Sequence, residues 1–543
     1  MTSNHKLTVG QAVIKLLEQY GVDTLFAIPG VHTLDFYRGL NISDIKHVQT
    51  RHEQGAAFMA DGYARASGRP GVALVISGPG VTNALTAIGQ AYADSIPVLL
   101  LSADAASHTL GKGWGVLHEV PDLTAVSKPL TAFAATAMAP ADVPELIARA
   151  FAIFASERPR PVHIAIPIDI LAMPAASNWT LTNLPERPSA ATHNITKACR
   201  MLSQASRPMI CVGGGAWQAG ESITRIAEKL GAPVIASIAG KGIVDDNHPL
   251  SLSAGTVRGE IQQYLKQADV VLAIGTELSE VDSFVETLEI NGQLIRVDID
   301  PRKMVDLYPT TLALIGDASQ TADAIEQGLK AHQLTNAAAC QQSRVEVAEL
   351  RRSIRNNLNH RESRHCIALD ILRDTLAQNT IVMTDICQLV YTGAFAFNVS
   401  APRLWHYPAG YCTLGCGLPN AIGAKLALPD TPVVCLTGDG GFMFTLQELV
   451  TAAELKLAIP IILWNNHALQ QIQDDMIEHD IELIGVLGMN PDFITLAESC
   501  HCSAITVDSA EGLSTAVKNA FNHDRPTVIE INETDSWLDD PQL

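Results

Sequence analysis

The sequence has little of the positive charge that nucleic-acid-binding proteins carry. It contains 37 lysine and arginine residues against 57 aspartate and glutamate residues, and its formal net charge is −20. No stretch of five or more basic residues occurs. Because a nucleic-acid backbone is bound mainly through clustered lysine and arginine, we expect no nucleic-acid partner.

Long hydrophobic runs are also lacking. The longest apolar stretch, VLLLSADAA at 98–106, is shorter than the ~18 residues that a membrane-spanning helix needs. The first residues, MTSNHKLTVGQ, contain no basic segment followed by an apolar run, so they do not resemble a secretory signal. We therefore expect a cytoplasmic protein that does not enter the membrane.

The ten cysteines are scattered, and no CxxC pair occurs among them. Cys500, His501 and Cys502 are consecutive, but a zinc-finger site needs a second ligand pair at a wider spacing. Reduced, mostly buried thiols are the expected state in a cytoplasmic protein. The cysteines thus predict neither a disulfide scaffold nor a metal centre.

Hydrophobic residues, by contrast, are abundant, at 47% of the 543 residues. This content supports several buried cores and excludes a disordered chain. Short apolar runs that end in glycine or proline alternate with segments of helical period, as in GVALVISGPG (71–80) followed by TNALTAIGQAYADS (82–95). Such alternation is typical of parallel α/β sheets.

The pattern predicts three consecutive open parallel-sheet α/β domains. We expect a first domain at 1–172, a middle Rossmann-like domain at 194–330 and a third domain at 364–543. The polar stretch at 173–193, with its prolines, serines and threonines, is predicted to be an exposed linker. Residues 331–363 are predicted to be a helical linker.

A glycine-rich motif follows an apolar run of the third domain, VVCLTGDGG, which ends with residues 438–441. The next such run, IPIILWNN, ends in Asn465 and Asn466. Because the carboxyl ends of parallel strands meet at one sheet edge, we expect Asp439 and Asn466 to lie close together. Their oxygens suit Mg²⁺, and the glycines let backbone N–H groups approach a diphosphate.

Together these two motifs resemble the GDG…NN fingerprint of thiamine-diphosphate (ThDP) enzymes. The segment at 50–99 closely resembles the pyrimidine-binding domain of the acetohydroxyacid synthase-like members. Its sequence is TRHEQGAAFMADGYARASGRPGVALVISGPGVTNALTAIGQAYADSIPVL. The resemblance extends over nearly the whole chain. It implies that the three domains are the pyrimidine-binding, middle and diphosphate-binding domains of this family.

The resemblance also implies roles for individual residues. Glu53 takes the position of the family's catalytic glutamate, which hydrogen-bonds N1′ of the aminopyrimidine ring. Leu414 takes the position of the apolar residue that holds ThDP in its V shape, and the backbone carbonyl of Cys412, where the family commonly has glycine, accepts from the 4′-amino group. Further cofactor contacts are implied for Pro29, Asn83, Gly438, Asp439, Gly440, Gly441 and Asn466. The implied Mg²⁺ ligands are Asp439, Asn466 and the backbone carbonyl of Ala468.

The family resemblance also has implications for the oligomeric state and for a nucleotide in the middle domain. In the family, one ThDP bridges the first domain of one subunit and the third domain of another, which implies at least a homodimer, often a homotetramer. The middle domain holds FAD in some members and another nucleotide or nothing in others. Gly213–Gly215 follow an apolar run, but the G-x-G-x-x-G fingerprint is not met, so FAD is only a minor alternative.

The implied reaction is decarboxylation of a 2-oxo acid through a C2-ylide and an enamine. Protonation of the enamine gives an aldehyde, whereas attack on a second carbonyl gives an acetolactate-type product. Acetohydroxyacid synthases carry a tryptophan after NN that selects the acceptor, and HALQQIQDDMIEHD (467–480) has none. The sequence thus favours a decarboxylase over an acetolactate-synthase-type carboligase. A non-catalytic regulatory subunit is disfavoured because Glu53, Leu414, Asp439 and Asn466 are all present.

Asp474 and Asp475 form an acidic pair in the same segment. Such carboxylates would give charge-assisted hydrogen bonds to a guanidinium or ammonium group, although a solvated acidic surface is the alternative. The neighbourhoods of His32 and Asp474 also resemble those of decarboxylases of 5-guanidino-2-oxopentanoate (2-oxoarginine). Among the histidines, His32 and then His118 are the favoured proton donors or carboxylate-binding groups. The adjacent histidine pair of pyruvate decarboxylases is missing, so pyruvate is not the expected substrate.

Overall fold

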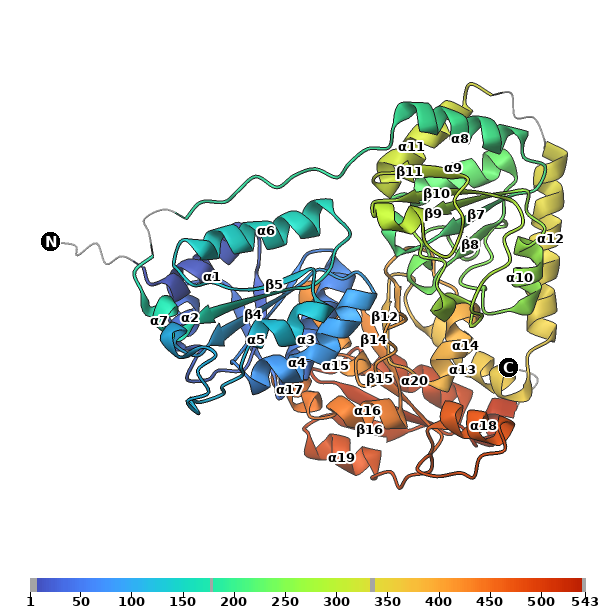
Figure 1. Ribbon diagram of the computed structural model, residues 1–543. Helices are drawn as coiled ribbons and strands as arrows, with labels where there is room; N and C mark the ends of the chain where they lie inside the picture. The colour runs from blue at the N-terminus through green and yellow to red at the C-terminus, as the bar shows by residue number, and fades with distance from the viewer. Residues whose placement is uncertain (1–6, 176–178, 333–336, 540–543) are drawn as a thin grey trace.

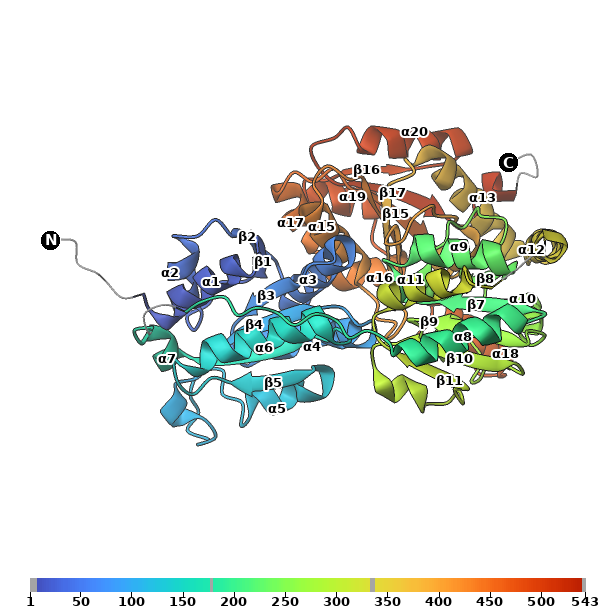
Figure 2. The same cartoon turned by 90° about the horizontal axis from the view of Figure 1, so that it is seen from above.

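The computed structural model describes residues 7–175, 179–332 and 337–539. These residues form three parallel sheets flanked by helices (Figures 1 and 2), which confirms the predicted fold class of three consecutive open α/β domains. The predicted segments 1–172, 173–193, 331–363 and 364–543 each include a few residues outside the described ranges, namely 1–6, 176–178, 333–336 and 540–543. The exact domain boundaries stay predictions.

The first domain contains a six-stranded sheet in the order β2-β1-β3-β4-β6-β5. Its strands are β1 (Thr24–Ala27), β2 (Lys46–Gln49), β3 (Gly71–Val75), β4 (Val98–Asp104), β5 (Phe133–Thr136) and β6 (Val162–Pro167). Its helices are α1 (Val9–Gln19), α2 (Leu34–Leu40), α3 (Glu53–Ser67), α4 (Pro79–Ala93), α5 (Leu123–Ser127), α6 (Asp142–Ser156) and α7 (Ile168–Ala172). The central strands β3 and β4 are buried throughout, as expected for parallel strands covered on both faces.

The middle domain contains a five-stranded sheet in the order β11-β10-β9-β7-β8. Its strands are β7 (Pro208–Val212), β8 (Val234–Ala236), β9 (Val270–Ile274), β10 (Gln293–Asp298) and β11 (Leu312–Ile315). Its helices are α8 (Thr192–Gln204), α9 (Gly220–Leu230), α10 (Gly259–Leu265), α11 (Ala318–Leu329) and α12 (Ala337–Asn356). Residues 179–191 form an extended segment that leads into α8 (Figure 1).

The third domain contains a six-stranded sheet in the order β13-β12-β14-β15-β17-β16. Its strands are β12 (Ile381–Thr384), β13 (Trp405–His406), β14 (Val433–Gly438), β15 (Pro460–Asn465), β16 (Ser503–Thr506) and β17 (Thr527–Asn532). Its helices are α13 (His360–Thr375), α14 (Gln388–Ala396), α15 (Gly417–Ala427), α16 (Asp439–Thr445), α17 (Glu448–Glu454), α18 (Gln470–Glu478), α19 (Phe493–Ser499) and α20 (Ala510–Ala520). None of the described helices is long and apolar enough to cross a membrane.

Helix boundaries coincide with capping residues in the sequence. Thr8 and Gln11 form a capping box at the start of α1, and the Asn359 side chain caps α13. Gly68 and Gly231 end α3 and α9 in the left-handed conformation that glycine adopts without strain. Local sequence therefore sets where these helices begin and end.

The first and third domains share one hydrophobic core, in which α3 packs antiparallel to α15. Two glycines allow the close approach of these helices. A Cβ atom at Gly62 would lie 2.2 Å from the carbonyl oxygen of Asn420, and one at Gly423 would lie 2.0 Å from that of Met59. The two domains are thus held in a fixed relation by backbone contact.

Candidate active site

Glu53 is the first residue of α3 and follows the short loop after β2. The Asn83 side chain, on α4, donates to the Glu53 carboxylate at 3.0 Å. Because β2 and β3 end at the same carboxyl edge of the first sheet, the segments that follow them reach one place. These two residues, both predicted to contact the cofactor, are in direct contact with each other.

His32 and His118 lie together at the same edge, with ring centroids 5.4 Å apart. Nδ1 of His32 shares a 2.7 Å hydrogen bond with the Ser77 hydroxyl. Burial, and then the neighbouring His118, lower the pKa of His32, so that His32 is neutral near pH 7. His118 has a left-handed φ of 61°, and its buried Nδ1 has no partner among the described residues. Pro29 is exposed in the loop between β1 and His32.

Asp439 is the first residue of α16, directly after β14, and Asn466 directly follows β15. β14 and β15 are neighbouring parallel strands, with Gly438 opposite Trp464. Their pairing places Asp439 and Asn466 at adjacent strand ends, on the carboxyl edge of the third sheet.

Asn490 links these two strand ends. Its side-chain amide donates to Asp439 at 2.7 Å and to the Asn465 side-chain oxygen at 3.0 Å. The backbone N–H of Gly440 donates to the other Asp439 oxygen at 3.0 Å, so each carboxylate oxygen keeps a lone pair for a further ligand. Nothing in the sequence pattern singles out Asn490, because it lies in an irregular loop.

The oxygen donors at this edge suit a magnesium ion. Within the described ranges, no group of three or more His, Cys, Asp and Glu side chains could hold a metal. The predicted set instead consists of the Asp439 carboxylate, the Asn466 amide oxygen and the Ala468 carbonyl. Such hard oxygen donors fit Mg²⁺, which usually completes its shell with phosphate oxygens and water. These residues therefore fit a Mg²⁺ ion that is shared with a diphosphate.

The segment that carries Cys412 and Leu414 is held by a buried carboxylate. Cys412 has a left-handed φ of 50°, which is strained for a residue other than glycine. Asp385, directly after β12, accepts the backbone N–H groups of Gly415 and Gly417 at 3.0 Å each. Burial raises the pKa of Asp385 to about 6. A sequence signal for Asp385 does exist, because it ends the apolar run TIVMTD as Asp439 ends VVCLTGD.

Asp474 and Asp475, both on α18, have different surroundings. Asp474 forms an ion pair with Arg361 and accepts from Gln470 at 2.8 Å. Asp475 accepts from Gln471 at 3.0 Å and has no cationic partner among the described residues. Of the acidic pair predicted from the sequence, Asp474 is thus paired with a cation, whereas the Asp475 carboxylate is available to a ligand.

Tyr391, on α14, is a partly buried phenol. Burial, followed by electrostatic repulsion from Cys412, Cys387 and Asp475, raises its pKa to about 12.

Within one chain, Glu53 and Asp439 lie at opposite ends of the interface between α3 and α15. α15 begins at Gly417, beside Asp385 at the carboxyl edge of the third sheet, and has 11 residues, a length of about 16 Å. Because α3 runs antiparallel to α15, Glu53 lies beyond the far end of α15. A single chain thus does not bring Glu53 to the strand ends of Asp439 and Asn466.

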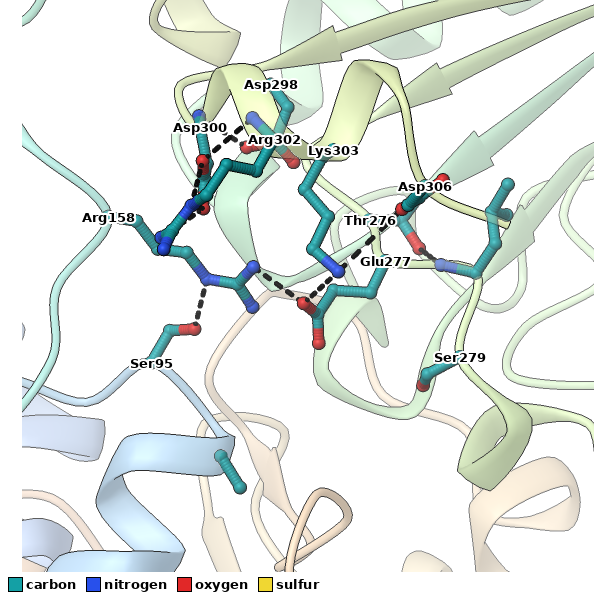
Figure 3. Close-up of polar contacts among 12 residues, drawn as sticks. Ser95, Arg158, Thr276, Glu277, Ser279, Asp298, Asp300, Arg302, Lys303 and Asp306 are labelled. Atoms are coloured by element: carbon teal, nitrogen blue, oxygen red, sulfur yellow. Dashed lines mark hydrogen bonds and ion pairs between the residues drawn. The ribbon is translucent and has the colours of Figure 1, made fainter. Parts of the chain in front are cut away.

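A cavity of about 290 Å³ is lined by residues of all three domains. Charged side chains of the first and middle domains meet at this cavity (Figure 3). Arg158 and Lys303 contact the Glu277 carboxylate at 2.6 and 2.7 Å, and Arg158 also donates to Ser95 at 2.9 Å. Burial alone would raise the pKa of Glu277, but these two cations lower it to about 2.

The glycines at 213–215 also line this cavity or adjoin it. They are explained by backbone packing, because a Cβ atom at Gly213 would lie 2.3 Å from the Gly275 carbonyl oxygen. They carry no separate indication of a dinucleotide. FAD therefore stays a minor alternative.

Three family models match the chain. The N-terminal TPP binding domain of thiamine pyrophosphate enzymes matches residues 7–126, the central domain matches 195–325 and the C-terminal TPP binding domain matches 385–531. Thiamine pyrophosphate (TPP) is another name for ThDP. The matches cover a large part of each of the three sheets.

Full-length relatives agree with the family models. A "Probable 2-ketoarginine decarboxylase AruI" of Pseudomonas aeruginosa (strain PAO1) is 49% identical over 98% of this chain and 95% of that protein. A "Probable acetolactate synthase large subunit" of Methanococcus aeolicus is 32% identical over 96% and 91% of the two chains. The "Acetolactate synthase isozyme 3 large subunit" of Escherichia coli (strain K12) is 31% identical over 96% and 93%. The chain belongs to the thiamine pyrophosphate enzyme family.

Proposed function

We propose that this protein decarboxylates a 2-oxo acid with a guanidino side chain, using ThDP and Mg²⁺. The observation that carries the proposal is the full-length similarity, at 49% identity, to a protein named as a probable 2-ketoarginine decarboxylase. The acetolactate synthases are less similar, at 32% and 31%. The family prediction made from the GDGG and NN motifs agrees with these relatives.

Asp475 supports a cationic substrate. Its carboxylate has no cationic partner in the described part of the chain, whereas Asp474 is already paired with Arg361. A guanidinium group binds such a carboxylate through two parallel charge-assisted hydrogen bonds. We therefore assign the recognition of the substrate tail to Asp475 rather than to the pair.

The proposed cofactor residues form two half-sites. The half-site of the first domain contains Glu53 and Asn83. The half-site of the third domain contains Cys412, Leu414, residues 438–441, Asn466 and Ala468. ThDP, when bound, supplies a carbon nucleophile for the 2-oxo group and an electron sink for the loss of CO₂. Glu53, held by Asn83, would hydrogen-bond the aminopyrimidine ring, and Leu414 and the Cys412 carbonyl would support the ring system. Residues 438–441, Asn466 and the Ala468 carbonyl would hold the diphosphate and Mg²⁺.

We assign His32 and His118 to the reacting end of the substrate, which is its 2-oxo acid group. His32 is kept neutral by burial and is oriented by Ser77. The Nδ1 atom of His118 has no partner in the described residues, so that it can bind a carboxylate oxygen or pass on a proton.

The active enzyme is a homodimer or a dimer of dimers. Support comes from the separation of Glu53 and Asp439 within one chain, because a single ThDP must reach both. Large apolar side chains are also exposed next to both half-sites, in loops and on α16. They include Val31 at 61%, Trp114 at 65%, Phe444 at 56% and Ile484 at 70%. Exposed apolar surface of this kind marks interaction sites, and a second copy would cover it while it completes the site.

Carboligation of the acetolactate type is the second candidate function. It is favoured by the full-length similarity to acetolactate synthases. In that case the Asp475 carboxylate would be solvated surface without a role in substrate binding.

The test measures CO₂ release and organic products with ThDP and Mg²⁺ over a panel of 2-oxo acids. We expect an aldehyde from 5-guanidino-2-oxopentanoate and little turnover of pyruvate. The matched control is the uncharged analogue 2-oxohexanoate, which should react poorly because it leaves the Asp475 charge unpaired. Acetolactate from pyruvate would contradict the proposal and support the synthase.

A further inference from the structure

In each chain a buried carboxylate of the third domain contacts the backbone just before Glu53. Glu448, the first residue of α17, is 0% exposed. Its carboxylate accepts the backbone N–H groups of Arg51 at 3.0 Å and of His52 at 3.1 Å. The Thr451 hydroxyl donates to the same carboxylate at 2.7 Å. The third domain thus holds the two residues that lead into Glu53.

This contact is close-packed. A Cβ atom at Gly55 would lie 2.3 Å from Oε1 of Glu448, so the start of α3 rests directly on the carboxylate. A negative charge at a helix start is also favoured by the helix dipole. The position of the Glu53 backbone therefore depends on Glu448.

A second contact acts in the opposite direction. Here residues of the first domain hold a segment of the third domain, the cofactor segment at residues 410–414. Gln90, on α4, is 0% exposed, and its side-chain oxygen accepts from the backbone N–H and the hydroxyl of Thr413 at 3.2 and 3.0 Å. Its amide donates to Asp94 at 2.7 Å, and Asp94 accepts from the backbone N–H of Gly410 at 2.7 Å. Both ends of the segment are thus fixed by α4.

Arg65 compensates the negative charge of the Asp94 carboxylate in this contact. Its guanidinium group donates to Asp94 at 2.7 Å and to Asp61 at 2.6 Å, and its side chain is 6% exposed. A buried carboxylate that is paired and hydrogen-bonded in this way avoids the cost of an isolated buried charge. Arg65 therefore holds Asp94 in place while Asp94 accepts from Gly410.

We propose that Glu448 and Gln90 are positioning residues, each of which fixes the catalytic segment of the other domain. Glu448 holds Glu53, and Gln90 holds the segment that carries Cys412 and Leu414. The inference rests on the proposed ThDP function. Because Glu53 and residues 410–414 of one chain serve different sites in the dimer, the two residues affect different properties of the enzyme.

The first experiment compares Glu448→Gln with wild-type protein. The side-chain amide removes the negative charge at the start of α3 and replaces the oxygen that accepts from Thr451 with an N–H donor, so Glu53 shifts. We expect unchanged ThDP affinity but exchange of the C2 proton of bound ThDP that is about 10- to 100-fold slower. The control is Glu454→Gln, which removes an exposed ion pair to the Arg51 side chain and leaves the Arg51 N–H contact intact. Exchange at the wild-type rate in Glu448→Gln would overturn the role of Glu448.

The second experiment measures ThDP affinity in Gln90→Met. Loss of the two hydrogen bonds to Thr413 should raise the dissociation constant of ThDP about tenfold, while proton exchange at saturating ThDP stays near the wild-type rate. Thr413→Val should give a smaller increase, and Thr413→Ser, which keeps the hydroxyl, should restore wild-type affinity. An unchanged dissociation constant in Gln90→Met would overturn the role of Gln90.

Two outcomes separate this inference from the proposed function. Wild-type protein that does not bind ThDP overturns the proposed function and the inference with it. Wild-type binding with unaltered variants overturns the inference alone. If Glu448→Gln does not fold, Thr451→Val, which removes only the hydroxyl contact to Glu448, should still slow proton exchange, and a wild-type rate there would refute the proposal.

Discussion

Single residues at the ends of strands carry the proposed chemistry. Asp439 follows β14, Asn466 follows β15 and Glu53 opens α3 shortly after β2. At such ends the side chains extend past the sheet edge, where ligands of open α/β folds bind. A substitution at such a position should therefore alter the reaction while it leaves the packing of the core largely unchanged.

At Glu53 we predict that Glu53→Gln binds ThDP but no longer promotes exchange of its C2 proton. The side-chain amide keeps the size of glutamate but cannot share a proton with the aminopyrimidine ring. Turnover of the 2-oxo acid should fall at least ~100-fold. Proton exchange followed by NMR, together with cofactor titration, checks this, and wild-type turnover would rule out the proposed role.

At Asp475 we predict that Asp475→Asn raises KM for 5-guanidino-2-oxopentanoate about tenfold or more, because a charge-assisted hydrogen bond is lost. Asp474→Asn serves as the matched control. It removes the partly exposed ion pair with Arg361, which costs little stability, and should leave substrate preference unchanged. Steady-state kinetics on both variants decides; equal effects would argue against a specific role of Asp475.

At the scale of elements, helices and central strands were easier to predict than edge strands. The runs of β3, β4, β14 and β15 are buried throughout. Strands β5, β11, β13 and β16 all lie at sheet edges, are two to four residues long and are partly exposed. Their apolar runs are absent or, as in LALI of β11, too short to be assigned from sequence, because pairing on one side alone defines them as strands.

The interface of α3 and α15 gives a prediction at this scale. Gly423→Ala should lower the free energy of unfolding by about 1–3 kcal/mol, because the new Cβ atom would clash with the Met59 carbonyl. Gly259→Ala is the matched control, since no atom lies within 4 Å of its Cβ position. Thermal unfolding of both variants tests the prediction. Equal melting temperatures would mean that the helices can move apart freely.

At the scale of the whole molecule, the two predicted half-sites, one around Glu53 and one around Asp439, lie apart in one chain. Helices α3 and α15 fix this arrangement through a common core. A second copy related by a two-fold axis would bring the opposite half-sites together twice, as isologous dimers do. In the proposed dimer, the site would form only on association.

Subunit mixing tests this arrangement. Glu53→Gln and Asp439→Asn should each be inactive as pure proteins, because each damages every site of its dimer. When the two variants are co-expressed, heterodimers contain one site with neither substitution, and activity should partly return. Activity assays on the purified mixture measure this, and a mixture as inactive as its components would place both residues in one chain's site.

Stability should also depend on pH through buried neutral histidines. Burial lowers the pKa of His163, which lies between Ser102 and Ser127, from 6.5 to about 3. Between these values the unfolded chain binds a proton that the folded chain does not, so stability falls as the pH decreases from about 6.5. Denaturant unfolding at several pH values should show this slope. His163→Asn should show a shallower slope, and an equal slope would exclude His163 as its source.

The sequence by itself determined the fold class and the family and predicted the residues of the half-sites, because these depend on local signals: apolar runs, turn glycines and polar residues after strands. The GDGG and NN motifs needed only the order of elements to be interpreted. Only the tertiary structure revealed that Asp474 is neutralised by Arg361, that Asn490 links Asp439 to Asn465, and that Glu448 and Gln90 hold the other domain's segments. These contacts join residues far apart in the chain, and no local pattern encodes which distant side chain will be the partner.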